Sequence, residues 1–311
     1  MVPFSYFDAH CDTLSCCTHF GWDFGKSGGH VDLARGAEFA RYGQVFAVYH
    51  DSAKAPADGM FAEFLRQTEM FDAQLLKHSD QMVQCCTIAD LTAAENDQKI
   101  AAVLSVEGAE LLECDPERLE LAHEKGVKMI NLTWNRANAV SGTNVEERDR
   151  GLSAQGRAFV KEAQRLGILP DVSHLSDPGF WDLMDIFEGP VVASHSDARA
   201  LCDHPRNLTD EMFRALRERG GFVGLNFYEP FIGRDHSIDA IFAHLEHFLE
   251  MEGERTVGFG CDWDGCDRVA GNLRGIQDMD RIYDKMLQRN YSEDLIEDLF
   301  YRNLKRTLFE R

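Results

Sequence analysis

The sequence predicts an α/β protein of the TIM-like (β/α)8 barrel type, and three observations lead to this prediction. Short β-rich runs that end in polar residues recur along the 311 residues, and longer segments with helical periodicity separate them. The side chains best suited to bind metal stand where the predicted strands end, which is where parallel barrels place their active sites. No linker, repeat or low-complexity tract divides the chain, so we expect residues 1–311 to form a single catalytic domain.

Eight segments have the pattern of buried parallel strands. Their residues are largely apolar, and each run is followed by polar residues or a turn. The predicted strands are 6–10, 44–49, 102–107, 128–133, 169–174, 191–195, 222–226 and 257–262.

The segments between these strands have the apolar spacing of amphipathic helices. Several begin with a capping residue, such as Ser176 before Asp177 and Pro178, Thr209 in LTDE, or Ser292 in YSEDL. The predicted helices are 60–77, 116–125, 153–166, 177–187, 210–219, 238–251, 278–288 and 292–309.

Composition limits the partners of this chain. The hydrophobic content of 44% is enough for a sizeable core, and the formal charge is −21. Such a charge repels phosphate backbones and anionic lipid, so we expect neither nucleic acid nor membrane as a partner. An anionic substrate would need a local cationic group to hold it.

The ends and the cysteines of the chain indicate its compartment. The N-terminus, MVPFSYFDAHCDTL, lacks a basic segment followed by an apolar one, and no window is apolar enough for a spanning helix. The nine cysteines contain no CxxC pair, which argues against a zinc ribbon and a disulfide framework. We expect a cytoplasmic protein with free thiols.

Residues with metal-binding side chains end five of the predicted strands. Imidazole and carboxylate suit Zn²⁺ and similar divalent ions, and this set is too large for one ion but suits two that share a carboxylate. Glu107 is the best-placed bridge, because an unpaired carboxylate is costly to bury. The two ions would acidify a shared water, whose proton Asp262 accepts; Asp264 is an alternative acceptor. The candidate set is His10, Asp12, Glu107, His174, His195 and Asp262.

Five motifs resemble, in order, those of the renal (membrane) dipeptidase family in the amidohydrolase superfamily. They are FDAHCDTL, LSVEGAELL, DVSHLSDPGFWDL, PVVASHSDARALCDHPRNLTDE and VGFGCDWDG, and the match covers nearly the whole chain. The resemblance implies a barrel hydrolase with two zinc ions, and it implies that Asp262 transfers the proton. Arg206, in DHPRN, is similar to the family arginine that pairs with the carboxylate of the substrate, and a guanidinium fork suits a carboxylate. The zinc ligands implied are His10, Asp12 and Glu107 for one ion, and Glu107, His174 and His195 for the other.

One position departs from the better-known family members. Where they carry a histidine near the scissile carbonyl, this chain has Trp134 in INLTWNRAN. An indole N–H can donate a hydrogen bond but cannot carry the charge of an imidazolium. We therefore interpret Trp134 as a substrate-binding position or pocket wall, and Asn135 or Asn138 as groups that could bind the carbonyl instead.

Four further histidines fall in apparent loops or at strand exits. They are His19, His30, His50 and His236, and none is predicted to bind metal. His50 could approach the pocket from the second strand without being a ligand.

The resemblance implies a zinc-dependent dipeptidase in which a metal-bridging hydroxide attacks the amide bond of a small dipeptide. It also implies tolerance of a C-terminal D-residue and a possible homodimer. The fold class alone does not separate this activity from hydrolysis of a cyclic amide, a lactone or an N-acyl amino acid. A third alternative, a non-catalytic binding protein, would usually have lost ligands. Phosphate-binding and serine-hydrolase functions are excluded, because neither a phosphate-binding loop nor a Gly-x-Ser-x-Gly motif is present.

Overall fold

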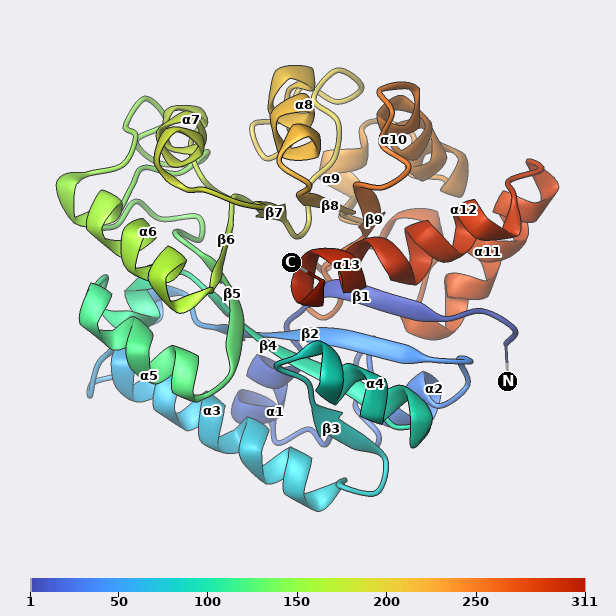
Figure 1. Ribbon diagram of the computed structural model, residues 1–311, viewed down its shortest axis with the longest axis horizontal. Helices are drawn as coiled ribbons and strands as arrows, with labels where there is room; N and C mark the ends of the chain where they lie inside the picture. The colour runs from blue at the N-terminus through green and yellow to red at the C-terminus, as the bar shows by residue number, and fades with distance from the viewer. Residues whose placement is uncertain (1, 311) are drawn as a thin grey trace.

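The computed structural model describes residues 2–310 and confirms the predicted barrel. Eight parallel strands form a closed ring in the order β2, β1, β9, β8, β7, β6, β5, β4, and the pairing of β2 with β4 closes it (Figure 1). The ring strands are β1 (Tyr6–Cys11), β2 (Tyr42–Tyr49), β4 (Ile100–Glu107), β5 (Val127–Asn131), β6 (Leu169–Asp171), β7 (Val192–Ala193), β8 (Phe222–Leu225) and β9 (Val257–Phe259).

A ninth strand, β3 (Met82–Gln84), lies outside the ring and was not predicted. It pairs with the first residues of β4, Met82 opposite Ile100, while β5 pairs with β4 further along, from Leu104 onward. Three residues are too few to show a recognisable hydrophobic period, which is why the sequence pattern does not reveal it.

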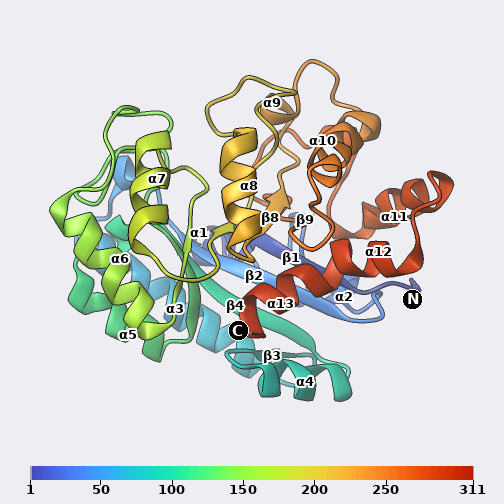
Figure 2. The ribbon, with the colours of Figure 1, turned by 45° about the horizontal axis from the view of Figure 1, so that its top comes forward.

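The helices surround the ring of strands (Figures 1 and 2). Predicted helices correspond to α3 (Met60–Lys77), α6 (Ala154–Leu166), α7 (Asp177–Ile186), α8 (Asp210–Glu218), α10 (Ile238–Glu250) and α11 (Met279–Gln288). Two predicted helices are interrupted: 116–125 is a 3-10 turn (Pro116–Arg118) followed by α5 (Leu119–Glu124), and 292–309 is α12 (Glu293–Glu297), a π turn (Asp298–Arg302) and α13 (Asn303–Phe309). Four helices were not predicted: α1 (Thr13–Phe20), α2 (Leu33–Gly36), α4 (Ile88–Asn96) and α9 (Glu229–Ile232). Within residues 2–310, none of the helices combines the length and apolar character needed to cross a membrane.

The N-terminal end of the barrel is closed by the end of the chain. Leu304 and Leu308 of α13 belong to one buried cluster with Phe7, Val45 and Phe222, which lie near the starts of their strands. In Figure 1, α13 accordingly lies over the centre of the ring. Burying each such side chain contributes about 1.5–3 kcal/mol. The candidate functional site lies at the opposite end of the barrel, where the strands finish.

Five strands, β5 to β9, are shorter than predicted, and in three of them the missing residues include predicted ligands. β6 ends at Asp171, β7 at Ala193 and β9 at Phe259 instead of at residues 174, 195 and 262. The backbone angle φ is 77° at His174 and 61° at Asp262, which is outside the β region. These ligand-type side chains are therefore presented by turns that follow the strands.

A close backbone contact draws the two sides of this region together. A Cβ at Gly260 would stand 1.6 Å from the carbonyl oxygen of Ser194, so only glycine fits. The contact brings the turn before Asp262 directly against the residue that precedes His195.

Candidate metal centre

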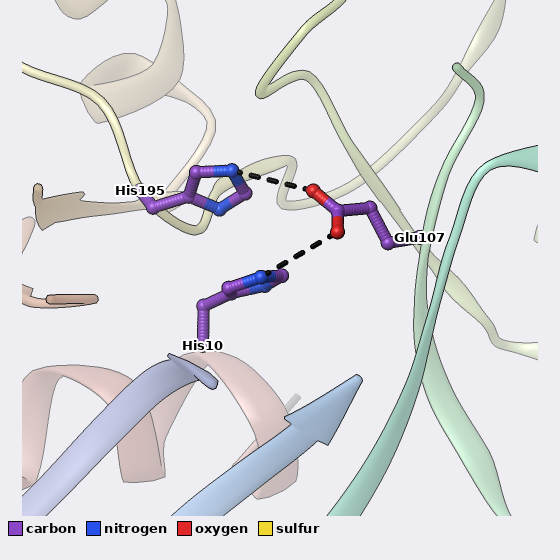
Figure 3. Close-up of side chains that lie close together, drawn as sticks. All are labelled: His10, Glu107 and His195. Carbon is purple, nitrogen blue, oxygen red and sulfur yellow. Dashed lines mark ion pairs between the residues drawn. The ribbon is translucent and has the colours of Figure 1, made fainter. Parts of the chain in front are cut away.

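Glu107 lies at the centre of the predicted ligand set. It ends β4, and Figure 3 shows one carboxylate oxygen directed at His10 and the other at His195. The His10 Nε2 atom lies 3.7 Å from Glu107 Oε2, and the His195 Nε2 atom lies 3.5 Å from Glu107 Oε1. All three residues are at most 2% exposed. A single carboxylate therefore faces imidazoles from two sides, as a bridging ligand must.

Asp12 and Asp262 stand on the other side of His10. Asp12 Oδ1 and Asp262 Oδ1 are each 3.9 Å from His10 Nε2. Gly265 makes this possible, because a Cβ there would stand 2.3 Å from Asp262 Oδ1 and 2.4 Å from Asp12 Oδ2. His10 thus belongs to two groups of potential ligands, one with Glu107 and His195 and one with the two aspartates.

Hydrogen bonds fix the proton of the third imidazole, that of His174. His174 Nδ1 lies 2.9 Å from the side-chain oxygen of Asn135, which only accepts, so this nitrogen carries the hydrogen. The unprotonated Nε2 then faces Glu107 Oε1 at 2.9 Å and His195 Nε2 at 2.9 Å. Burial lowers the pKa of both histidines well below its usual range, and the charge of Arg206 lowers it further. The Nε2 lone pair of His174 is therefore directed toward the carboxylate of Glu107.

Several buried atoms of the centre have no partner. In the part of the chain that the structure describes, both ring nitrogens of His10 and Oδ1 of Asp12 lack a hydrogen bond. Burial raises the pKa of Asp12 and of Glu107 well above the usual range, and the neighbouring carboxylates raise both further. Unpaired buried polar atoms are costly, and cations would satisfy them. Donor type, burial and missing partners all fit divalent metal ions, and five such ligands suit two.

Arg206 supplies the only guanidinium among the residues that line this cavity. It lies between β7 and α8 and is 4% exposed, and its Nη2 atom is 3.1 Å from His174 Nε2. Its Nε and Nη1 atoms have no partner among residues 2–310. Burial lowers its pKa, which the surrounding carboxylates oppose. A buried guanidinium with unused N–H groups can donate charge-assisted hydrogen bonds to an anionic ligand.

The cavity at this centre has a volume of about 250 Å³. This is smaller than the roughly 300–1,000 Å³ of pockets for drug-sized ligands and favours a small substrate. Several residues that line the cavity were not predicted from the sequence. Tyr49 is one of them, and its position as the last residue of β2 could have indicated that it lies at the cavity. The residues that line the cavity are Asp12, Tyr49, Glu107, Trp134, Asn135, His174, Arg206, Tyr228, Phe231, Asp262, Gly265, Cys266 and Asp267.

The structure distinguishes the two candidate proton acceptors. Asp262 lines the cavity, and its Oδ2 atom accepts a hydrogen bond of 3.1 Å from the Asn226 side chain, which leaves Oδ1 toward His10. Both oxygens of Asp264 are occupied: Thr13 donates to one at 2.6 Å, and the backbone of His30 donates to the other at 2.5 Å. Asp262 is therefore the better-placed acceptor.

Trp134 and its neighbours form one wall. The Trp134 ring centre lies 5.1 Å from that of Tyr49 and 6.3 Å from that of His174. Asn135 also lines the cavity, but its side-chain oxygen orients His174. Asn138 is instead used locally, because its amide donates to Glu110 and to the carbonyl of Leu132.

Comparisons with known proteins point to one family. The sequence profile of a family described as membrane dipeptidase (peptidase family M19) matches residues 1–310. An uncharacterised protein from the PQQ-III 3′ region of Acinetobacter calcoaceticus is 34% identical over 251 residues, which cover 71% of this chain and 79% of that protein. An uncharacterised dipeptidase of Schizosaccharomyces pombe is 34% identical over 256 residues, covering 78% of this chain and 61% of that protein.

A solved structure matches over the whole barrel. It is a metallopeptidase from Rhodobacter sphaeroides liganded with a phosphinate mimic of the dipeptide L-Ala-D-Ala. The two chains share 28% sequence identity with a TM-score of 0.89, and the match covers 98% of each.

Proposed function

Because this chain belongs to the membrane dipeptidase family, peptidase family M19, we propose that it hydrolyses the amide bond of small dipeptides with two divalent cations, Zn²⁺ in the simplest case. Family membership makes it a metal-dependent dipeptidase. The number and identity of the ions and the roles of individual residues are the substance of the proposal.

One observation carries the proposal: the buried ligand-type side chains stand beside a buried arginine in a small cavity. Neither part alone defines a dipeptidase. Unpaired imidazole and carboxylate atoms call for cations, and the unused nitrogens of Arg206 call for an anion. A dipeptide with a free C-terminal carboxylate meets both requirements, because its amide carbonyl lies only a few bonds from that carboxylate.

We assign the ligands to two cations as the family resemblance implies, with the carboxylate of Glu107 shared between them. When bound, such cations acidify water and polarise a carbonyl, and this is the chemistry that they supply. Asn135 positions His174 for this purpose through the hydrogen bond to Nδ1. The assigned sets are His10, Asp12 and Glu107 for one ion, and Glu107, His174 and His195 for the other.

Asp262 acts as general base and then as general acid. Its Oδ1 atom faces the cluster while Asn226 fixes the other oxygen, so the carboxylate is oriented before substrate arrives. In this position it takes a proton from the attacking water and returns it to the leaving amine.

Arg206 holds the substrate carboxylate and so sets the length of the substrate. The metallopeptidase of R. sphaeroides binds a phosphinate mimic of L-Ala-D-Ala, and we extend to this chain the preference for a small dipeptide that tolerates a D-residue at its C-terminus. Trp134 and Tyr49 line the same cavity and restrict the bulk of the substrate.

A panel of substrates tests the proposal. L,L- and L,D-dipeptides are compared with dipeptide amides, N-acyl amino acids, lactones and cyclic amides on the metal-loaded enzyme. We expect dipeptides to have the highest kcat/KM and amidation of the C-terminus to lower it by about 100-fold, because a charge-assisted hydrogen bond to the carboxylate is lost. A preference for a cyclic amide, a lactone or an N-acyl amino acid would overturn the dipeptide assignment in favour of another amidohydrolase reaction.

A further inference from the structure

A second group of imidazoles and a carboxylate lies outside the catalytic centre. It consists of His19 of α1, His50 directly after β2, and Glu63 of α3, and we call it the peripheral cluster. One potential ligand atom from each lies within 4.8 Å of the others. His19 Nε2 is 3.2 Å and His50 Nδ1 is 3.9 Å from Glu63 Oε1. The elements meet because α1 packs beside α3, as Figure 1 shows.

Backbone carbonyls fix the protons of both histidines. His19 Nδ1 lies 2.8 Å from the carbonyl oxygen of Ser15, and His50 Nε2 lies 2.9 Å from that of Lys54. A carbonyl oxygen only accepts, so each of these nitrogens carries a hydrogen. In the neutral rings, the nitrogens that face Glu63 are therefore unprotonated. Such a bond from the second ring nitrogen to a carbonyl is how proteins orient metal-binding histidines.

The carboxylate is held in place in the same way. Gln67 donates to Glu63 Oε1 at 2.7 Å, and Arg66 donates to Oε2 through Nε at 2.9 Å and Nη2 at 2.8 Å. Burial opposes ionisation of Glu63, but these hydrogen bonds outweigh it and lower the pKa of the carboxyl. Oε1 keeps one lone pair, which is directed toward the two imidazoles.

The spacing of these atoms suits a shared ion. Four ligands placed about 2.0–2.1 Å from Zn²⁺ in a tetrahedron lie roughly 3.3 Å from one another. Within the peripheral cluster the separations are 3.2 and 3.9 Å, against 3.5 and 3.7 Å for Glu107 and its two imidazoles in the catalytic centre. The same cation could therefore be accepted by small movements of the side chains.

We propose that His19, His50 and Glu63 bind a third divalent cation of the zinc class. The two histidines line a cavity of about 380 Å³, which adjoins the catalytic cavity through Asp12 and Tyr49. His19 is 35% exposed and His50 is 16% exposed at the side chain, so an ion can enter from solvent and keep an open position. The bound ion ties α1 to α3 and to the end of β2. This inference goes beyond the dipeptidase function and does not depend on it.

Counting Zn²⁺ in the whole chain tests the proposal. Wild type, His19→Ala/His50→Ala and the exposed control His123→Gln are dialysed to equilibrium at a series of buffered free Zn²⁺ concentrations, and bound zinc is measured by mass spectrometry. We expect wild type and His123→Gln to bind one more ion per chain than the double variant. The difference between variants is independent of how many ions the catalytic centre holds.

A second, milder variant tests the site in case the double variant does not fold. His50→Gln removes one ligand from a partly exposed position, and we expect it to weaken the extra site by more than about 100-fold, since even an outer-shell partner costs 10- to 100-fold. Equal zinc content in all variants at every concentration would overturn the proposal. It would leave the cluster as a contact between His19 and Glu63 that holds no metal ion. A catalytic centre that fails to bind zinc would be visible separately, as a lower count shared by every variant.

Discussion

The catalytic centre and the peripheral cluster contain the same kinds of side chain, but their surroundings differ. In the catalytic centre, His10 and Asp12 have buried atoms without partners among residues 2–310, and burial raises the pKa of Glu107. In the peripheral cluster, Gln67 and Arg66 donate hydrogen bonds to the two oxygens of Glu63, and these bonds lower its pKa. The first group contains ligand-type atoms whose partners residues 2–310 do not supply, even with Arg206 close by. The second is stable as it stands, so we expect it to bind metal more weakly.

The largest effect that this comparison predicts is on activity at Glu107. Glu107→Gln removes the carboxylate that both assigned cations share, and we expect kcat/KM for dipeptides to fall by at least about 1,000-fold. Rates are measured at saturating Zn²⁺, with the surface variant Glu162→Gln as control. A Glu107→Gln enzyme that keeps a tenth of wild-type activity would show that the bridging assignment is wrong.

The next effect concerns the arginine of the catalytic centre. Arg206→Lys replaces a guanidinium that has two unused nitrogens with a point charge, and we expect kcat/KM for a dipeptide to fall by about 100-fold. The same variant should lose much less on the corresponding dipeptide amide, which has no carboxylate to bind. Equal losses on both substrates would contradict carboxylate binding and indicate that Arg206 serves only to support His174.

A smaller effect, opposite in sign at the two sites, concerns the stability of the metal-free protein. The pKa of Glu107 is raised above its ordinary value of 4.5. The contribution of the Glu107 carboxyl to the free energy of unfolding is therefore fully present below pH 4.5 and is lost as the pH rises through the raised pKa. Glu107→Gln should therefore stabilise the metal-free chain by about 1–3 kcal/mol at neutral pH and have little effect in acid.

Glu63→Gln provides the matched comparison. It breaks a pairing with Arg66 and should destabilise the metal-free chain by about 1 kcal/mol at neutral pH. Both free energies of unfolding are measured by urea denaturation in the presence of a chelator. The same sign for the two variants would remove the distinction between the two sites.

The smallest effect is expected at Trp134. If this residue is a wall that packs near Tyr49 and His174, Trp134→Phe preserves the contact and should change kcat by less than about threefold. A loss near 100-fold would instead indicate that the indole N–H donates to the substrate carbonyl. Steady-state kinetics on a single L,D-dipeptide distinguishes the two roles.

The difference between the two sites also explains what the sequence could predict. His10 and Glu107 end long strands whose apolar runs are clear, so their meeting at one end of a parallel barrel could be predicted. The peripheral cluster could not, because it depends on the packing of α1 against α3, and α1 was not among the predicted helices. No pattern in the sequence therefore indicated that His19 and His50 lie close together.

The short strands mark a second limit of prediction. His174 and Asp262 were expected inside strands, yet the strands end before them and the backbone turns to positive φ. Their proximity to the site was still predictable, since a turn that follows a parallel strand also lies at the barrel mouth. The hydrogen bond that gives Asn135 its orienting role depends on that turn geometry and has no counterpart in the linear pattern.

The central claim is that Asp262 moves a proton at a centre whose metal content does not depend on it. The most direct test measures bound metal and turnover of L,L- and L,D-dipeptides together, on wild type and on Asp262→Asn. We predict equal metal content in the two proteins, with the variant slower by about 1,000-fold in kcat, within the range for loss of a general base. Undiminished turnover by Asp262→Asn, or a metal-loaded wild type that cleaves none of the dipeptides, would contradict the account.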